Sequence, residues 1–241
     1  MANFFVDKEA FLLDPIILEG DEANHIVKVL RMKKGDSLTI FDGSGNCADG
    51  VIDSVDGKTV TVNALKRYPS DTEPKLKITL FQGIPKNPKM DLIIQKATEL
   101  GVVEIVPVNT KRIVAKIDKD AKVERLQRIA FEAAKQCGRA YIPKVSYPIS
   151  FEEAIKRMQK MDGAIIPYEC EKDGRINNAV NSNMQSLGIL IGPEGGFEES
   201  EVKRAEDAGI KRVTLGKRIL RTETAGLIAS ALALFIAGDM N

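Results

Sequence analysis

From Leu76 onward, short apolar runs alternate with segments of helical periodicity, and this alternation restricts the fold more than any other feature of the chain. The runs have the length and composition of buried strands and occupy residues 76–81, 104–108, 164–167, 187–191 and 212–215. Helical patterns fill the intervals, as in residues 126–137, where apolar positions recur every three or four residues. Strands that alternate with helices in this way predict an α/β fold built on a parallel sheet.

The N-terminal part of the chain has a different pattern and predicts a small β domain. Alternating strand patterns at residues 37–41 and 59–64 are punctuated by turns rich in Asp and Gly, and one helix interrupts them at residues 21–30. The segment 67–74 is polar and framed by prolines, which is typical of a linker. We therefore expect two domains, residues 1–70 and 75–241, each of which is long enough to bury a core.

Composition and charge narrow the possible partners. Basic and acidic residues, 35 and 34, nearly cancel, but residues 82–144 carry 13 basic against 7 acidic side chains, so an anion-binding surface is expected there.

Three cysteines without a CxxC pair and a single histidine predict neither a disulfide framework nor a metal site. The N-terminus does not resemble a signal peptide, and the longest apolar run, 225–237, is short for a membrane span. We expect a cytoplasmic protein that does not bind a membrane.

Two glycine-bearing loops follow strand candidates. Gly192, Gly195 and Gly196 come directly after one strand, which indicates either a ligand that the backbone approaches closely or a tight strand-to-helix turn. Gly216 follows a second strand, and ligands of open α/β sheets bind beyond the carboxyl ends of the strands. The loops therefore suggest one shared pocket with Arg221 and Glu223 beside it, whereas Arg218 is interpreted as a surface residue. Neither a Walker motif nor GxGxxG is present.

Six ordered motifs together resemble the RsmE family of 16S ribosomal RNA uracil-N3 methyltransferases, within the SPOUT superfamily. They are HIVKVLR at 25–31, PKNPKMD at 85–91, QKATELG at 95–101, EAAKQCGR at 132–139, GPEGG at 192–196 and LRTETA at 220–225. The resemblance covers essentially the whole chain. It implies a PUA-like β barrel followed by a SPOUT domain whose C-terminal part is a trefoil knot, which periodicity alone does not indicate.

The resemblance also implies S-adenosylmethionine as the cofactor, held by backbone groups and apolar side chains without a metal. The corresponding cofactor-binding positions in this sequence are Ile166, Pro167, Leu190, Gly192, Gly195, Gly196, Leu215, Ile219 and Leu220.

Methylation of uracil N3 requires an unpaired or flipped base and removal of the N3 proton. We expect Arg221 to stabilise negative charge on the uracil oxygens and Glu223 or Glu194 to accept the proton, although a structural hydrogen bond is an equally good role for Glu194. The expected RNA contacts, with 16S ribosomal RNA or the small ribosomal subunit as partner, are His25, Lys28, Arg31, Lys86, Lys89, Arg128, Lys135 and Arg139. A partly buried histidine with a structural role is an equally good interpretation of His25.

The last helix predicts a homodimer. Residues 227–236 are apolar on nearly every side, so a second surface besides the sheet of the same subunit must cover them. The RsmE family dimerises through its knotted domain, which agrees.

Two other functions fit parts of the pattern. One is a non-catalytic RNA-binding or assembly factor, and the other is an enzyme that uses ATP or a dinucleotide. Binding of S-adenosylmethionine distinguishes both from a methyltransferase.

Overall fold

The computed structural model describes residues 3–86, 88–115, 117 and 120–240. The described residues form two compact units, of which the first comprises those of Met1–Glu73 together with Ala134–Ile142. The second comprises those of Pro74–Ala133 and Pro143–Asn241. The first unit therefore includes a segment that follows much of the second unit in the sequence.

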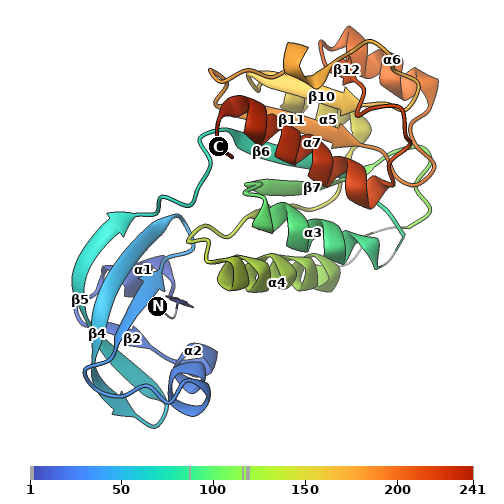
Figure 1. Ribbon diagram of the computed structural model, residues 1–241. Coiled ribbons are helices and arrows are strands. Elements are labelled where there is room, and N and C mark those ends of the chain that lie inside the picture. The colour runs from blue at the N-terminus through green and yellow to red at the C-terminus, as the bar shows by residue number, and fades with distance from the viewer. Residues whose placement is uncertain (1–2, 87, 116, 118–119, 241) are drawn as a thin grey trace. The chain divides into compact units, whose positions relative to one another are not determined.

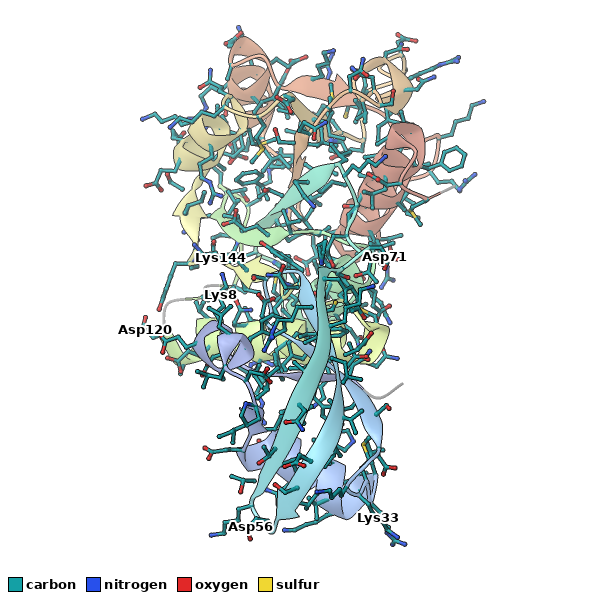
Figure 2. The ribbon with its side chains drawn as sticks, turned by 90° about the vertical axis from the view of Figure 1, so that its left-hand side faces the viewer. Lys8, Lys33, Asp56, Asp71, Asp120 and Lys144 are labelled. Carbon is teal, nitrogen blue, oxygen red and sulfur yellow. The ribbon has the colours of Figure 1, made fainter. Side chains whose placement is uncertain are left out.

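The first unit is built on a five-stranded sheet of order β1-β3-β4-β5-β2. Its two long strands, β4 and β5, run side by side (Figures 1 and 2). Its strands are β1 (Asn3–Phe5), β2 (Ile16–Leu18), β3 (Ser37–Phe41), β4 (Asn46–Asp56) and β5 (Thr59–Pro69). Only the β1–β3 pair is parallel, and register shifts in the β4–β5 pair interrupt the ladder. Inward-facing apolar side chains of these strands, including Phe4, Leu38 and Val62, are fully buried and form the core of the unit.

The helix expected at residues 21–30 begins as an α-helix and continues as a π-helix. After α1 (Lys8–Leu12), the chain forms α2 (Gly20–Asn24) and then one π-helical turn, His25–Val29, closed by a bond from the Leu30 amide to the His25 carbonyl at 3.0 Å. Arg31 follows with φ +54°, a left-handed conformation that is rare for residues other than glycine. π-Helical turns and strained residues occur often at functional sites.

The second unit contains a seven-stranded parallel sheet, and all five expected runs are strands of it. The principal order is β12-β10-β11-β6-β7-β8, and β9 also pairs with β7. The strands are β6 (Lys77–Gly83), β7 (Glu104–Asn109), β8 (Lys144–Val145), β9 (Ile149–Ser150), β10 (Gly163–Pro167), β11 (Ser186–Ile191) and β12 (Lys211–Val213). The prediction of a parallel α/β sheet is confirmed.

Helices cover both faces of this sheet (Figure 1). Leu80 of β6 packs with α3 (Lys89–Glu99), α4 (Asp120–Cys137) and α7 (Thr222–Ala237) on one face. The next residue, Phe81, packs with α5 (Phe151–Met158) and α6 (Glu199–Asp207) on the other. A short 3₁₀ turn, Ile176–Asn178, completes the helices. Because both faces are covered, the carboxyl edge of the strands is where loops can form a ligand site.

Candidate active site

A cavity of about 500 Å³ lies at the carboxyl edge of the sheet. The loop 192–197 after β11 and the segment 219–222 at the start of α7 both line it, together with Pro167 at the end of β10. A smaller cavity of about 90 Å³ shares Pro167, Glu169 and Leu220 with the first and is also lined by residues 214–218. The two loops that the sequence singled out therefore border one continuous region.

Most of the expected cofactor-binding positions line these cavities, and two do not. The lining positions are Pro167, Gly192, Gly195, Gly196, Leu215, Ile219 and Leu220. Ile166 and Leu190 are fully buried and pack in the core beneath α5 and α6, because the side chains of a strand covered on both faces point into those faces. Glu169 and Phe197 also line the larger cavity but were not expected from the sequence. The sequence feature that could have indicated Glu169 is its position two residues after the end of β10, at the edge of the sheet where ligands bind.

The glycines of the 192–196 loop permit close approaches that a side chain would block. Gly196 has φ +65°, and a Cβ there would lie 2.9 Å from Glu169 Oε1. A Cβ on Gly192 would lie 3.2 Å from the backbone of Gly196 and from the Phe197 ring. A hydrogen bond of 3.0 Å from the Gly196 amide to the Pro193 carbonyl closes the turn. The loop is thus a tight turn and also a wall of the cavity.

Lys89, the first residue of α3, joins two of the expected catalytic carboxylates. Its Nζ lies 3.2 Å from Glu194 Oε1 and 3.1 Å from Glu223 Oε2. Glu223 Oε2 is buried and accepts no hydrogen bond of good geometry, so the nearby ammonium group is its principal electrostatic partner. Glu194 Oε1 also accepts a 3.0 Å bond from the Lys86 amide, whereas the Arg221 side chain is 81% exposed and lies 3.9 Å from Glu223. Lys89 and Glu194 line the cavity.

This ion cluster keeps both carboxylates ionised. Burial acts to raise the pKa of Glu194, but hydrogen bonds from backbone amides and the charge of Lys89 outweigh it, so the pKa lies below its ordinary value. The same balance lowers the pKa of Glu223, where burial is opposed by its own amide, Lys89 and Arg221. The ion pair with Glu223 is the largest influence on Lys89 and raises its pKa. At neutral pH the cluster therefore contains two carboxylates and an ammonium group.

A buried hydrogen-bond chain fixes the wall of the cavity to the sheet. The Thr222 hydroxyl donates to the Gly192 carbonyl at 2.6 Å and accepts from Gln82 Nε2 at 2.8 Å. Gln82 belongs to β6, so the 192–196 loop, the start of α7 and the central strand are linked through one threonine. Buried polar chains of this kind restrict conformational freedom when their members are paired.

The expected RNA contacts of the first unit fall into two groups. Lys28 and Arg31 are exposed, and His25 is half-buried with its ring against Phe4. Lys135 and Arg139 are engaged in ion pairs instead. Lys135 Nζ lies 2.6 Å from Glu22, and Arg139, only 4% exposed, binds Glu73 through two bonds of 2.6 and 3.1 Å.

The structure therefore gives Arg139 a role that the sequence did not indicate. Helix α4 ends at Cys137 and Gly138 reverses the chain with φ +78°, so Arg139 does not continue the helical stripe from which its exposure was expected. The buried guanidinium of Arg139 is engaged by a bidentate carboxylate within the unit, so it is not exposed to bind a phosphate.

The three RNA contacts expected in the second unit also fall into two groups, exposed and ion-paired. Lys86 and Arg128 are exposed. Lys89 is instead part of the ion cluster at the cavity. Within the described residues there is no group of three His, Cys, Asp or Glu side chains that could hold a metal ion, and no helix is long and apolar enough to cross a membrane.

Comparison with known proteins identifies the family. The model of the RNA methyltransferase domain matches residues 72–234, and that of the RNA methyltransferase PUA domain matches residues 18–65. Ribosomal RNA small subunit methyltransferase E of Bacillus subtilis is 38% identical over 221 residues, which are 88% of this chain and 86% of that protein. The chain belongs to the ribosomal RNA small subunit methyltransferase E family.

Other members of this family are similar in sequence and in structure. The Mesomycoplasma hyopneumoniae protein is 33% identical, with 94% of this chain and 96% of that protein covered. The crystal structure of the Neisseria gonorrhoeae protein bound to S-adenosyl methionine has a TM-score of 0.85 and 32% identity and covers 96% of both chains. The family that the six motifs indicate is thereby confirmed.

Proposed function

We propose that this protein transfers a methyl group from S-adenosylmethionine to N3 of a uracil in 16S ribosomal RNA of the small ribosomal subunit. The observation that carries the proposal is the cavity of about 500 Å³ formed by the glycine loop, with the Lys89 ion cluster in its wall. Relatives named small subunit methyltransferase E, one of them solved with S-adenosyl methionine, support the cofactor and the RNA. The resemblance to the RsmE family supplies the N3 position.

The lining of the cavity suits this cofactor. Ile191, Leu220 and Ala225 offer apolar surface to an adenine ring, and the glycines of the 192–196 loop bring backbone to the cavity wall without side chains of their own. Glu169 lines both cavities and is placed to pair with a cationic group of the cofactor. When bound, the cofactor supplies an electrophilic methyl group carried on a sulfonium centre.

The residues of the ion cluster take different roles in removal of the N3 proton. Glu194 lines the cavity, and we assign it as the proton acceptor. Glu223 is not among the lining residues and holds Lys89 from its buried side, so it acts as a positioning residue. Arg221, which lines the cavity with an exposed guanidinium, stabilises the negative charge that develops on the uracil oxygens. A cation next to the uracil oxygens lowers the cost of forming the uracil anion.

The proposal also covers the RNA-binding residues, the compartment, the oligomeric state and the knot. His25, Lys28 and Arg31 of the first unit and Lys86 and Arg128 of the second bind the RNA backbone, and the protein works in the cytoplasm as a homodimer. We further propose that the C-terminal part of the second unit is a trefoil knot, as the family resemblance implies.

The dimer interface that we propose includes α7. Its buried face carries residues such as Gly226 and Ala233, whereas Ile228, Leu232 and Phe235 project from another face and remain exposed. Their spacing of four and three residues places them on one stripe of the helix. An apolar stripe of this length on a protein of this size is best covered by a two-fold copy of itself.

The test is methylation of small ribosomal subunits from a strain that lacks its own member of the family. The purified protein, incubated with these subunits and S-adenosylmethionine carrying a labelled methyl group, should add one methyl group, which mass spectrometry of RNA fragments should locate on N3 of a uridine. Glu194→Gln should lower the rate of transfer while calorimetry shows unchanged cofactor affinity.

The same calorimetry distinguishes the rival functions. Tight binding of ATP or a dinucleotide, with none of S-adenosylmethionine, would favour a different enzyme. RNA binding without cofactor binding would indicate an assembly factor.

A further inference from the structure

The segment 217–221, here called the rim loop, is the second part of the connection between β12 and α7 and lies beside both cavities. Both of its ends are anchored. The Thr214 hydroxyl accepts a 3.2 Å bond from the Gly216 amide, and the Arg221 carbonyl accepts bonds from the Thr224 and Ala225 amides at 2.9 and 2.8 Å. Between these anchors Lys217, Arg218 and Ile219 are exposed. The rim loop thus presents two adjacent cations from a fixed base at the cavity.

The charges of Lys217 and Arg218 are not neutralised by an acidic side chain in the part of the chain that the structure describes. Other cations near the glycine loop are neutralised: Lys89 binds two glutamates, and Lys111 binds Glu198 at 2.8 Å. Arg112, which is also exposed, donates a 3.0 Å bond to the Gly195 carbonyl, and its charge acts on Glu198 together with that of Lys111. Two cations thus share one carboxylate, which leaves one positive charge in excess.

Arg112 and the rim loop therefore border the lining of the larger cavity from two different segments. Arg112 contacts the 192–196 loop, and residues 219–221 of the rim loop belong to the lining itself. Lys217 and Arg218 line the smaller cavity, which shares Ile219 and Leu220 with the larger one. Arg112 and the rim loop both present excess positive charge. At the wall of the cavity, in contrast, the charge of Lys89 is more than matched by those of Glu194 and Glu223. Positive charge is concentrated where a polyanion would approach and is balanced where the base would react.

We propose that Lys217 and Arg218, with Arg112, bind the phosphates of single-stranded RNA on either side of the nucleotide whose base enters the cavity. This inference rests on the proposed function and adds a binding surface to it. A base flipped out of a strand must bring its own phosphates to the mouth of the pocket that receives it. Because the rim loop lines the cavities, a phosphate held there belongs to the target nucleotide or to one next to it.

The cofactor is a poorer match for these cations than RNA. S-adenosylmethionine carries two positive groups and one carboxylate, so a cluster of unpaired cations repels it on balance. The alternative role of Lys217 and Arg218 is to bind that single carboxylate. The two roles differ in which ligand loses affinity when the charges are removed, and in the salt dependence of binding.

The experiment compares two double variants of the full-length protein. K217Q/R218Q removes the charges of Lys217 and Arg218. K144Q/K160Q removes two exposed lysines at the amino-terminal edge of the sheet, one at the start of β8 and the other before β10. Figure 2 labels Lys144. Binding of a labelled 20-nucleotide polyuridine is measured from 50 to 300 mM salt, and binding of S-adenosylmethionine is measured by calorimetry. Neither measurement depends on methyl transfer.

The expected result is specific to the rim loop. The slope of log affinity against log salt for K217Q/R218Q should be smaller by about 1.4, since each phosphate contact to a single strand contributes about 0.7. RNA affinity at 100 mM salt should fall about tenfold or more, with cofactor affinity unchanged, and K144Q/K160Q should match the wild type.

An unchanged salt slope for K217Q/R218Q, or a loss confined to cofactor affinity, would overturn the inference while leaving the proposed function intact. An equal loss in both double variants would also overturn it, because binding would then follow net charge alone. Wild-type protein that binds neither RNA nor cofactor would contradict the proposed function as well.

Discussion

Replacement of Arg139 by methionine should destabilise the first unit and should not act as the loss of an RNA contact. The guanidinium is 4% exposed and holds Glu73, itself 12% exposed, through two bonds of 2.6 and 3.1 Å. Removing one partner of a buried pair costs about 3 to 5 kcal/mol, because the other charge remains without compensation. Glu73 retains some access to water, so we expect the lower end of that range, about 3 kcal/mol.

The assay is urea unfolding followed by far-ultraviolet circular dichroism, since the chain has no tryptophan. Hydrogen exchange resolved by peptide should then show the change in the first unit, including residues 43–45, which hydrogen-bond to Ala140 and Ile142 next to Arg139. The double variant R139M/E73L should recover most of the loss, because a buried ion pair replaced by apolar groups is often neutral.

Arg128→Met is the matched control, since Arg128 is an exposed arginine of α4. It should change stability by less than about 0.5 kcal/mol and weaken RNA binding. The reasoning fails if Arg139→Met is as stable as the wild type and loses RNA affinity in the same way as Arg128→Met.

Three further predictions concern the cavity and the dimer. Gly196→Val should abolish cofactor binding, measured by calorimetry, and should also cost about 1 to 2 kcal/mol of stability because of the positive φ. Lys89→Met removes the ammonium charge that lowers the pKa of Glu194 and Glu223, so both pKa values should rise. The acid limb of the pH–rate profile should therefore move to higher pH, whereas Lys89→Arg should leave it in place. Phe235→Glu should yield a monomer by light scattering with an unchanged circular dichroism spectrum; a dimer of wild-type mass would place the interface elsewhere.

The sequence predicted the parallel sheet because its strands are buried on both faces and read as continuous apolar runs. Leu80 and Phe81 illustrate this, since consecutive residues pack on opposite faces of β6. The strands β1, β2, β8 and β9 were missed, because two or three residues are too few for a periodic pattern. Their pairing depends on the rest of the sheet. The eleven-residue strand β4 was missed as well, because Asp49, Gly50 and Asp53 interrupt its apolar pattern.

The site was predictable as a set of loops, and its internal contacts were not. The Gly192–Gly196 loop and Arg221 could be found because glycines and charged residues follow apolar runs. The position of Lys89 between Glu194 and Glu223 depends instead on β6 lying next to β11, a neighbour relation between strands far apart in the sequence. Strand order in an open sheet cannot be read from local patterns. Lys89 was therefore placed among the RNA contacts.

The distribution of charge at the cavity gives the two proposed substrates separate regions of the site. Glu169, Glu194 and Glu223 lie in or just behind its wall, where carboxylates favour a cofactor with net positive charge. The excess positive charge lies on the rim loop and at Arg112, which shares Glu198 with Lys111, and there it favours a polyanion. Lys89 keeps two of the three carboxylates from repelling that polyanion, because it neutralises part of their charge. Its loss should therefore weaken RNA binding as well as shift the acid limb, although it need not contact a phosphate.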